Sequence, residues 1–143
     1  MSRSPALLRF VDYWHTLTPR AVDAIGSIYT DDAYFRDPFQ EVTGIDKVQH
    51  IFADMFVRLD APRFAISETI EEPHGALLIW DFTFRLKSDK PAVVRQIHGS
   101  SHIRFAADGR VQYHRDYWDA AGELYEKLPL VGALMRFLKK RAG

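Results

Sequence analysis

Cysteine is absent from the 143-residue chain. A disulfide framework and a zinc site built on thiolates are therefore excluded, and the redox compartment is left open. The N-terminal segment MSRSPALLRF also lacks a long apolar run, so we expect neither a signal peptide nor a transmembrane segment there. Together these absences favour a cytoplasmic protein.

An excess of either charge is also missing, because 19 Lys and Arg residues balance 19 Asp and Glu residues. Nucleic-acid-binding proteins normally show a basic excess, so no such partner is expected. Aromatic residues are abundant instead, at 13% of the chain, which suits a large core or an aromatic-lined cavity. The length fits one domain with one core, and we expect residues 1–143 to form it.

The first third of the chain is predicted to be mostly helical. Apolar residues recur at helical spacing over residues 7–14. Thr18 with Pro19 is typical of an N-cap followed by the first residue of a second helix, and an apolar stripe continues from there to Tyr29. Residues 34–39 are too few and too aromatic for a helix, so they are predicted to form a short strand.

The clearest helical pattern in the chain covers residues 45–59. Thr43 and Asp46 resemble a capping box at its start. The Ala61-Pro62 pair is expected to end this helix, because the residue before a proline disfavours helical backbone angles.

The second half of the chain changes to a period of two, which is typical of strands with one apolar face. Polar turns separate the alternating segments, and residues 120–141 are helical again with a break near Pro129. Helices followed by a meander of strands indicate an α+β fold, in which one curved antiparallel sheet wraps around helices and encloses a cone with an open mouth. The four strands of the meander are predicted at residues 64–71, 78–86, 93–105 and 111–118.

The segment IYTDDAYFRDPF, followed by Gly44 and an amphipathic helix, resembles the nuclear transport factor 2-like superfold. That group includes ketosteroid isomerases, SnoaL-like polyketide cyclases, limonene-epoxide hydrolases and scytalone dehydratases. The resemblance covers residues 4–119 and implies a cone-shaped, cystatin-like fold, to which this chain adds a C-terminal helix. It specifies the function less well than the fold, because this fold carries many chemistries.

Similarity to individual members of the superfold points to particular residues. Asp37 matches the general base of ketosteroid isomerases, and Tyr13 matches their oxyanion-hole tyrosine. Ser101 stands where those enzymes have a second, acidic oxyanion donor, and a serine can donate only a neutral hydrogen bond. His114 and Asp116, in the segment HRDYWD, resemble the last strand of SnoaL-like cyclases more closely.

The residues themselves leave two interpretations open at each of these positions. Asp37 precedes a proline, so it is either a turn cap or a carboxylate facing an apolar cavity, where desolvation favours proton uptake. His114 and Asp116 are two apart on a strand and share a face with Trp118. They form either an acid/base couple in a pocket or a polar pair on a solvated face.

The neighbouring strand places His98, Ser100 and His102 on one face. His98 and His102 are ~13 Å apart at ~3.3 Å per residue, too far to share a metal ion, so no metal site is expected. The resemblance implies that Ser101 faces inward and the histidines outward, and we expect this polar outer face to form a homodimer contact, a frequent use of that face in this fold.

The C-terminal segment EKLPLVGALMRFLKKRAG combines apolar and basic residues. Such a helix either closes one end of the cone, contacts a second copy of the chain, or lies as a basic amphipathic helix on a membrane surface. The first two interpretations are favoured over peripheral membrane contact.

These observations favour a cofactor-free isomerase, lyase or cyclase that acts on a small, largely apolar carbonyl compound. Asp37 or Asp116 would remove a proton beside the carbonyl, Tyr13 and Ser101 would hydrogen-bond the enolate, and His114 would assist proton delivery. The cavity wall is expected to include Tyr13 together with Trp14, Phe39, Phe52, Met55, Phe56, Trp80, Phe82 and Trp118.

Two other functions remain open from the sequence. A non-catalytic ligand-binding or dimerisation module would have the same apolar cavity without an acid beside a hydrogen-bond donor. A hydrolase that activates water would need several polar side chains around one water, for which the chain offers only Asp37, His114 and Asp116.

Overall fold

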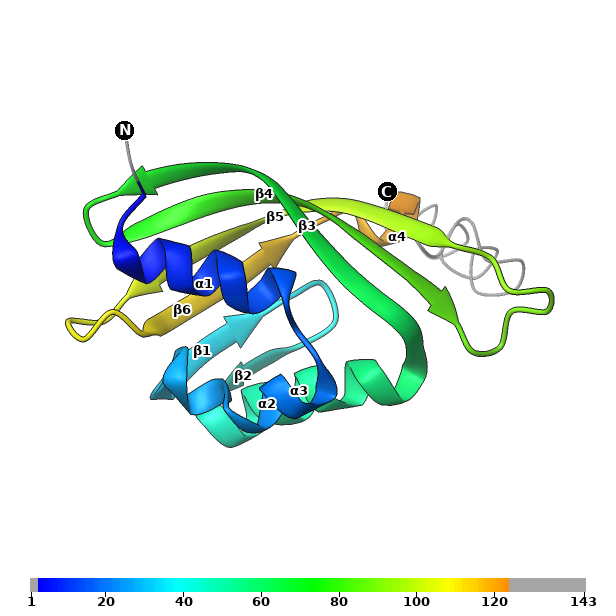
Figure 1. The fold of residues 1–143 in the computed structure, drawn as a ribbon, viewed down its shortest axis with the longest axis horizontal. Helices are drawn as coiled ribbons and strands as arrows, with labels where there is room; N and C mark the ends of the chain where they lie inside the picture. Colours follow the sequence, from blue (N-terminus) through cyan, green and yellow to red (C-terminus); the bar gives the residue numbers. More distant parts are fainter. Residues whose placement is uncertain (1–2, 124–143) are drawn as a thin grey trace, which may run out of the picture.

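The computed structural model describes residues 3–123 of the chain (Figure 1). Helix α1 (Pro5–His15) begins at Ser4, whose hydroxyl accepts a hydrogen bond from the Leu7 backbone N–H at 3.2 Å. Helix α2 (Pro19–Asp23) begins in the same way at Thr18, which accepts from Ala21 at 3.1 Å. The predicted N-cap at Thr18 is therefore confirmed, and each helix has a proline where a backbone N–H is not needed.

Helix α3 (Ile45–Arg58) begins at the residue where the longest apolar stripe predicts it, but its cap and its last residue differ from the prediction. The capping box is wrong, because Thr43 is the last residue of strand β2 (Glu41–Thr43) and is paired there with Tyr34. Gly44 takes the cap position instead with φ of 112°, a conformation that favours glycine. The helix also ends at Arg58, three residues before the predicted stop.

Six strands form one curved sheet in the order β2-β1-β6-β5-β4-β3 (Figure 1). The last four strands form the predicted antiparallel meander, and among the strands of residues 3–123 the pair of β1 with β6 alone is parallel. This mixed α+β architecture confirms the predicted fold class. The strands that complete it are β1 (Tyr29–Arg36), β3 (Leu59–Glu72), β4 (Gly75–Leu86), β5 (Arg95–Phe105) and β6 (Val111–Tyr117).

Strand β1 starts five residues earlier than predicted and ends before Asp37. Its first residue, Tyr29, pairs with Val111 of β6, so a segment expected to continue a helix becomes a buried strand. The turn that follows begins at Asp37, whose N–H donates to the Gln40 carbonyl and closes the hairpin between β1 and β2 one rung beyond Arg36 and Glu41.

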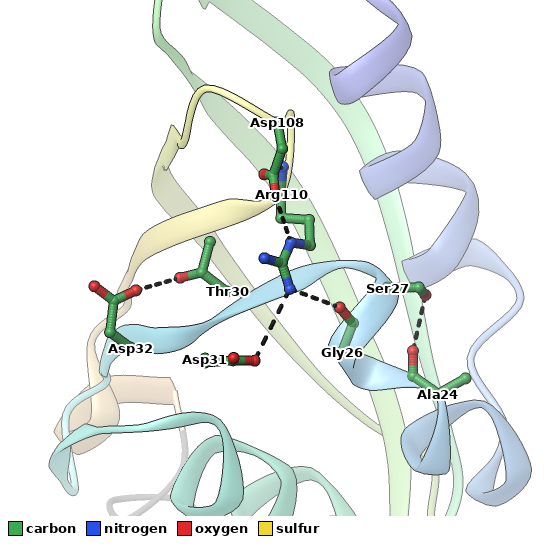
Figure 2. Close-up of polar contacts among 8 residues, drawn as sticks. All are labelled: Ala24, Gly26, Ser27, Thr30, Asp31, Asp32, Asp108 and Arg110. Atoms are coloured by element: carbon green, nitrogen blue, oxygen red, sulfur yellow. Dashed lines mark hydrogen bonds and ion pairs between the residues drawn. The ribbon is translucent and has the colours of Figure 1, made fainter.

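The start of β1 is fixed by the hairpin between β5 and β6 (Figure 2). Arg110 donates from Nε to Asp108 at 2.8 Å and from Nη1 to the carbonyl of Gly26 at 3.2 Å, in the short helix η1 (Ile25–Ser27). The Val111 N–H also donates to the Ile28 carbonyl at 2.7 Å. These contacts set the parallel register of β1 and β6. Tyr29 therefore lies on β1, next to β6, and its side chain reaches His114.

Helix α1 runs across the sheet in Figure 1, whereas α2 and α3 lie near β1 and β2. Within the described part of the chain, no helix is long and apolar enough to cross a membrane. The predicted helix at residues 120–141 is described only as α4 (Ala120–Glu123), and the remainder of that prediction lies outside the described residues. The side chains that form the centre of the core include Leu7, Phe10, Val11, Phe35, Val48, Phe52, Leu78, Phe84, Ile97 and Ile103.

Candidate functional site

A cavity of about 580 Å³ is enclosed by the sheet and by helices α1 and α3. Its wall is mainly aromatic and aliphatic, and the few polar side chains include Asp37, Ser101, His114 and Asp116. The residues predicted for the wall that line it are Trp14, Phe39, Phe52, Met55, Trp80, Phe82 and Trp118.

Two residues predicted to line the cavity are placed elsewhere. Phe56 lies about 100° around α3 from Met55, so it faces a separate depression between α2 and α3. Tyr13 precedes Trp14 on α1 and points toward α2, where its hydroxyl donates to the Ala21 carbonyl at 2.8 Å. Burial raises the pKa of Tyr13 to about 12. The structure therefore does not bring Tyr13 together with Asp37.

Asp37 combines the two interpretations that its sequence position leaves open. Its carboxylate lines the cavity, yet it also caps the turn between β1 and β2. Oδ1 accepts from the backbone N–H groups of Phe39 at 2.8 Å and Gln40 at 3.0 Å, and Oδ2 accepts from the Gln40 side chain at 3.2 Å. Because Phe39 and Gln40 are both exposed, this turn forms part of the cavity rim.

A continuous chain of hydrogen bonds crosses the buried part of the cavity wall. Tyr29 Oη lies 2.7 Å from His114 Nδ1, and His114 Nε2 lies 2.6 Å from Asp116 Oδ1. Ser101 donates to the same Asp116 oxygen at 2.5 Å, and Trp80 Nε1 donates to Ser101 at 2.8 Å. We call these five residues the buried network.

Strand geometry explains how these residues meet. His114, Asp116 and Trp118 alternate along and just beyond β6, so all three face the cavity, while Arg115 faces away. Ser101 of β5 pairs directly with Asp116 across the ladder, which brings their side chains together. The same alternation turns His98 outward, where its ring bonds to Asp81 at 2.8 Å.

The hydrogen-bond partners fix where the protons of the network lie. Burial raises the pKa of Tyr29 well above its ordinary value of 10, and the nearby Asp116 carboxylate raises it further. Tyr29 is therefore a hydroxyl that can donate. Because Asp116 accepts at Oδ1, His114 Nε2 carries the ring proton, which leaves Nδ1 of the neutral ring to accept from Tyr29.

The indole of Trp14 lies beside this network but does not join it. Its N–H lies near enough to the Tyr29 hydroxyl to oppose the rise in the Tyr29 pKa, but it is buried and meets hydrogen-bond geometry with no atom of the described residues. The Trp14 ring instead contacts Phe52 and Phe64 edge-on, at centroid distances of 4.9 and 4.8 Å. Trp14 is thus part of the apolar wall.

Asp116 has one carboxylate oxygen, Oδ2, that takes no part in the hydrogen bonds of the buried network. Its side chain is 18% exposed and lines the cavity, whereas that of His114 is only 3% exposed. Both hydrogen bonds to Asp116 end on Oδ1, so Oδ2 receives none from the described part of the chain. Among residues 3–123, no cluster of acidic or histidine side chains could hold a metal ion. The arrangement can take up a proton in an apolar environment.

Gly99 leaves the space that the Trp80 indole needs. A Cβ there would lie 2.6 Å from Trp80 Cη2 and 3.0 Å from Trp118 Cβ. We expect Gly99→Ala to displace the indole and lower the free energy of unfolding by ~1–3 kcal/mol through overpacking. Urea unfolding measures this, and the loss should shrink in the background of Trp80→Leu. Strictly additive losses would show that the two side chains do not collide.

Comparison with known proteins identifies the family of the chain and solved structures with the same fold. The sequence matches the family model of the SnoaL-like domain over residues 9–114. A search of curated proteins finds no significant match. Many solved structures share the fold, at sequence identities that support similarity of fold alone.

Three of these structures illustrate the range of proteins that share the fold. A hypothetical protein with a ketosteroid isomerase-like fold from Catenulispora acidiphila, in complex with trimethylamine, has a TM-score of 0.73 at 13% identity, covering 90% of this chain and 96% of its own. A putative SnoaL-like polyketide cyclase from Jannaschia has a TM-score of 0.72 at 17% identity, with 90% and 99% covered. An LEH-like epoxide hydrolase from M. tuberculosis has a TM-score of 0.67 at 16% identity, with 94% and 93% covered.

Proposed function

Because this chain belongs to the SnoaL-like domain family, we propose that it binds a small, largely apolar molecule and acts on it by cofactor-free acid/base chemistry. Asp116 is the base in this proposal. The observation that carries it is the unbonded Oδ2 of Asp116, which belongs to a carboxylate lining an apolar cavity and oriented by His114 and Ser101. A base at such a position meets less competition from water for the substrate proton.

Asp116 is favoured over Asp37 because the two carboxylates are held differently. Asp37 accepts three hydrogen bonds, with both oxygens engaged at the exposed turn. Asp116 accepts two bonds on one oxygen and keeps the other for a ligand. His114 then supports the carboxylate during proton uptake and return, as histidine–carboxylate couples do.

The donors predicted for an enolate are already occupied. The hydroxyl hydrogen of Ser101 goes to Asp116, and that of Tyr13 goes to Ala21. A carbon acid that delocalises its own charge, such as one flanked by two carbonyl groups, therefore fits better than a simple ketone. For such carbon acids, isomerisation, elimination and aldol-type cyclisation can each begin with this proton transfer.

Exchange of substrate hydrogen tests the base without knowledge of the final product. Polyketide-like diketones, steroid enones and epoxides are incubated with the protein in D₂O and followed by NMR. We expect the wild type to speed deuterium uptake at the acidic carbon of a diketone, and Asp116→Asn to abolish that acceleration. Binding without exchange or product from any compound would instead support a non-catalytic ligand-binding module, the alternative function.

We also predict that the protein is a homodimer that assembles through the outer face of β5 in the cytoplasm. His98 and His102 lie on that face with Gln96 and Ser100, and none of the four carries a strong charge. Ser100→Arg should convert the dimer to monomers by placing a charge in the contact. Sedimentation measures both forms. A single species of 16.5 kDa for the wild type at high micromolar concentration contradicts the prediction.

A further inference from the structure

We propose that the buried network selects ligands by hydrogen-bond direction: the inner end of the ligand must carry a hydroxyl, phenolic or enolic, that donates to Asp116 Oδ2. A ligand whose inner polar group can only accept a hydrogen bond is rejected. This inference rests on the proposed function, since it concerns the same cavity and the same oxygen: the enol form of a diketone presents such a hydroxyl to Oδ2, and the proton taken from it can return to the neighbouring carbon. It adds the class of molecule that the cavity takes.

The hydrogens of the network are all directed to other protein atoms. Trp80 donates to Ser101 at 2.8 Å, and Ser101 donates to Asp116 at 2.5 Å. His114 Nε2 lies 2.6 Å from the same carboxylate, and the Tyr29 hydroxyl lies 2.7 Å from His114 Nδ1. A ligand that reaches the network therefore meets an acceptor with a free lone pair and no free donor.

The two other nearby donors do not change this balance. The Tyr13 hydroxyl points away from the cavity to the Ala21 carbonyl. The Trp14 indole N–H has no hydrogen-bond partner within the described residues, but its nitrogen is buried and is not accessible to a ligand. The inner wall otherwise consists of aromatic and aliphatic side chains, which suit a flat aromatic skeleton.

The rim of the cavity, unlike the inner wall, offers hydrogen-bond donors. Arg58 lines the cavity with a largely exposed side chain, and within residues 3–123 its one ion pair is from Nε to Asp54 at 2.7 Å. Its remaining N–H groups are available to acceptor groups of a ligand. We infer that a bound molecule is oriented with its hydroxyl inward and its carbonyl groups toward Arg58.

The strength of this selection follows from the cost of burying an acceptor without a donor. A buried oxygen that loses its water and gains no hydrogen bond is disfavoured by roughly 10- to 100-fold in affinity. The carboxylate adds repulsion between lone pairs. A donor at the same place regains a charge-assisted hydrogen bond, which is stronger than a neutral one.

Matched naphthalene probes test the proposal. 2-Naphthol carries a donor, and 2-methoxynaphthalene replaces its hydrogen by a methyl group on the same oxygen. Binding is measured by calorimetry at a pH where naphthol is neutral, and a slightly larger third probe, 2-ethylnaphthalene, reports the effect of size. We expect naphthol to bind wild type at least ~10-fold more tightly than the methyl ether.

Asp116→Asn is the decisive variant, because an amide presents donors as well as an acceptor. In this variant we expect the preference for naphthol to fall below about 3-fold, since the methyl ether gains a donor. Asp81→Asn is the matched control, because Asp81 lies on the outer face bonded to His98. It should keep the full preference.

The outcomes separate this inference from the proposed function. Equal affinity of wild type for naphthol and its ether, or an unchanged preference in Asp116→Asn, would overturn the selection while leaving a small-molecule cavity in place. Failure of all probes to bind at millimolar concentration, together with no deuterium exchange in the diketone screen, would overturn both.

Discussion

Asparagine at position 116 should lower turnover of the substrate by ~10²–10⁴-fold, the usual cost of losing a general base. The amide keeps the shape of the carboxylate and can still accept from Ser101 or His114, but it cannot take up a proton. The wild type and Asp116→Asn are compared by kcat/KM for the first compound whose hydrogen exchange the wild type catalyses. Thermal unfolding of the same variant shows whether the fold is intact.

Asp37→Asn is the matched comparison, because it makes the same chemical change at the other carboxylate that the sequence predicts as a base. Asparagine also caps turns by accepting from backbone N–H groups, so the bonds from Phe39 and Gln40 should survive. We expect turnover within a few fold of wild type. A large loss here with little change at Asp116 would assign the base to Asp37, as the resemblance to ketosteroid isomerases implies. Full turnover in both variants would show that neither carboxylate is the base.

Much of the fold could be predicted because periodicity is a local property. Alternation along residues 111–118 places His114, Asp116 and Trp118 on one face whatever the neighbouring strand is. The same reasoning places His98 on the face opposite Ser101 in β5, and the resemblance implies that this face is the outer one, as the structure has it. Spacing predicts these shared faces well, because a strand keeps its period of two along its length.

The parts that could not be predicted depend on contacts distant in sequence. Tyr29 continues a helical stripe in the sequence, but pairing with Val111, more than eighty residues away, makes it a strand residue beside His114. Tyr13 lies at the edge of its helical stripe, where a change of 100° decides between the cavity and α2. The Ala21 carbonyl, which accepts from it, settles that choice. The apolar pattern of one segment shows neither the strand that will pair with it nor the carbonyl that will accept a hydrogen bond from it.

Tyr29 should make the stability of the protein fall steeply in alkaline solution. Its pKa is raised by burial, so its contribution to stability is fully present below the ordinary value of 10 and is lost as pH rises from 10 toward the raised value. Over that range the unfolded chain ionises while the native hydroxyl does not. The free energy of unfolding therefore decreases by up to ~1.4 kcal/mol per pH unit from this group.

Tyr29→Phe isolates this effect, because phenylalanine keeps the ring that stacks on His114 at 5.9 Å but cannot ionise. Near neutral pH the variant should be less stable by ~1–3 kcal/mol, since His114 Nδ1 loses its buried partner. The difference from wild type should shrink above pH 10, by up to about 2 kcal/mol at pH 11.5. Urea unfolding between pH 7 and pH 11.5 measures it, with Ile103→Val as a core control whose loss of ~0.5–1.5 kcal/mol stays constant. A constant difference for Tyr29→Phe as well would mean that the native hydroxyl ionises as readily as an unfolded one, and the buried network would then lack the donor assigned to it.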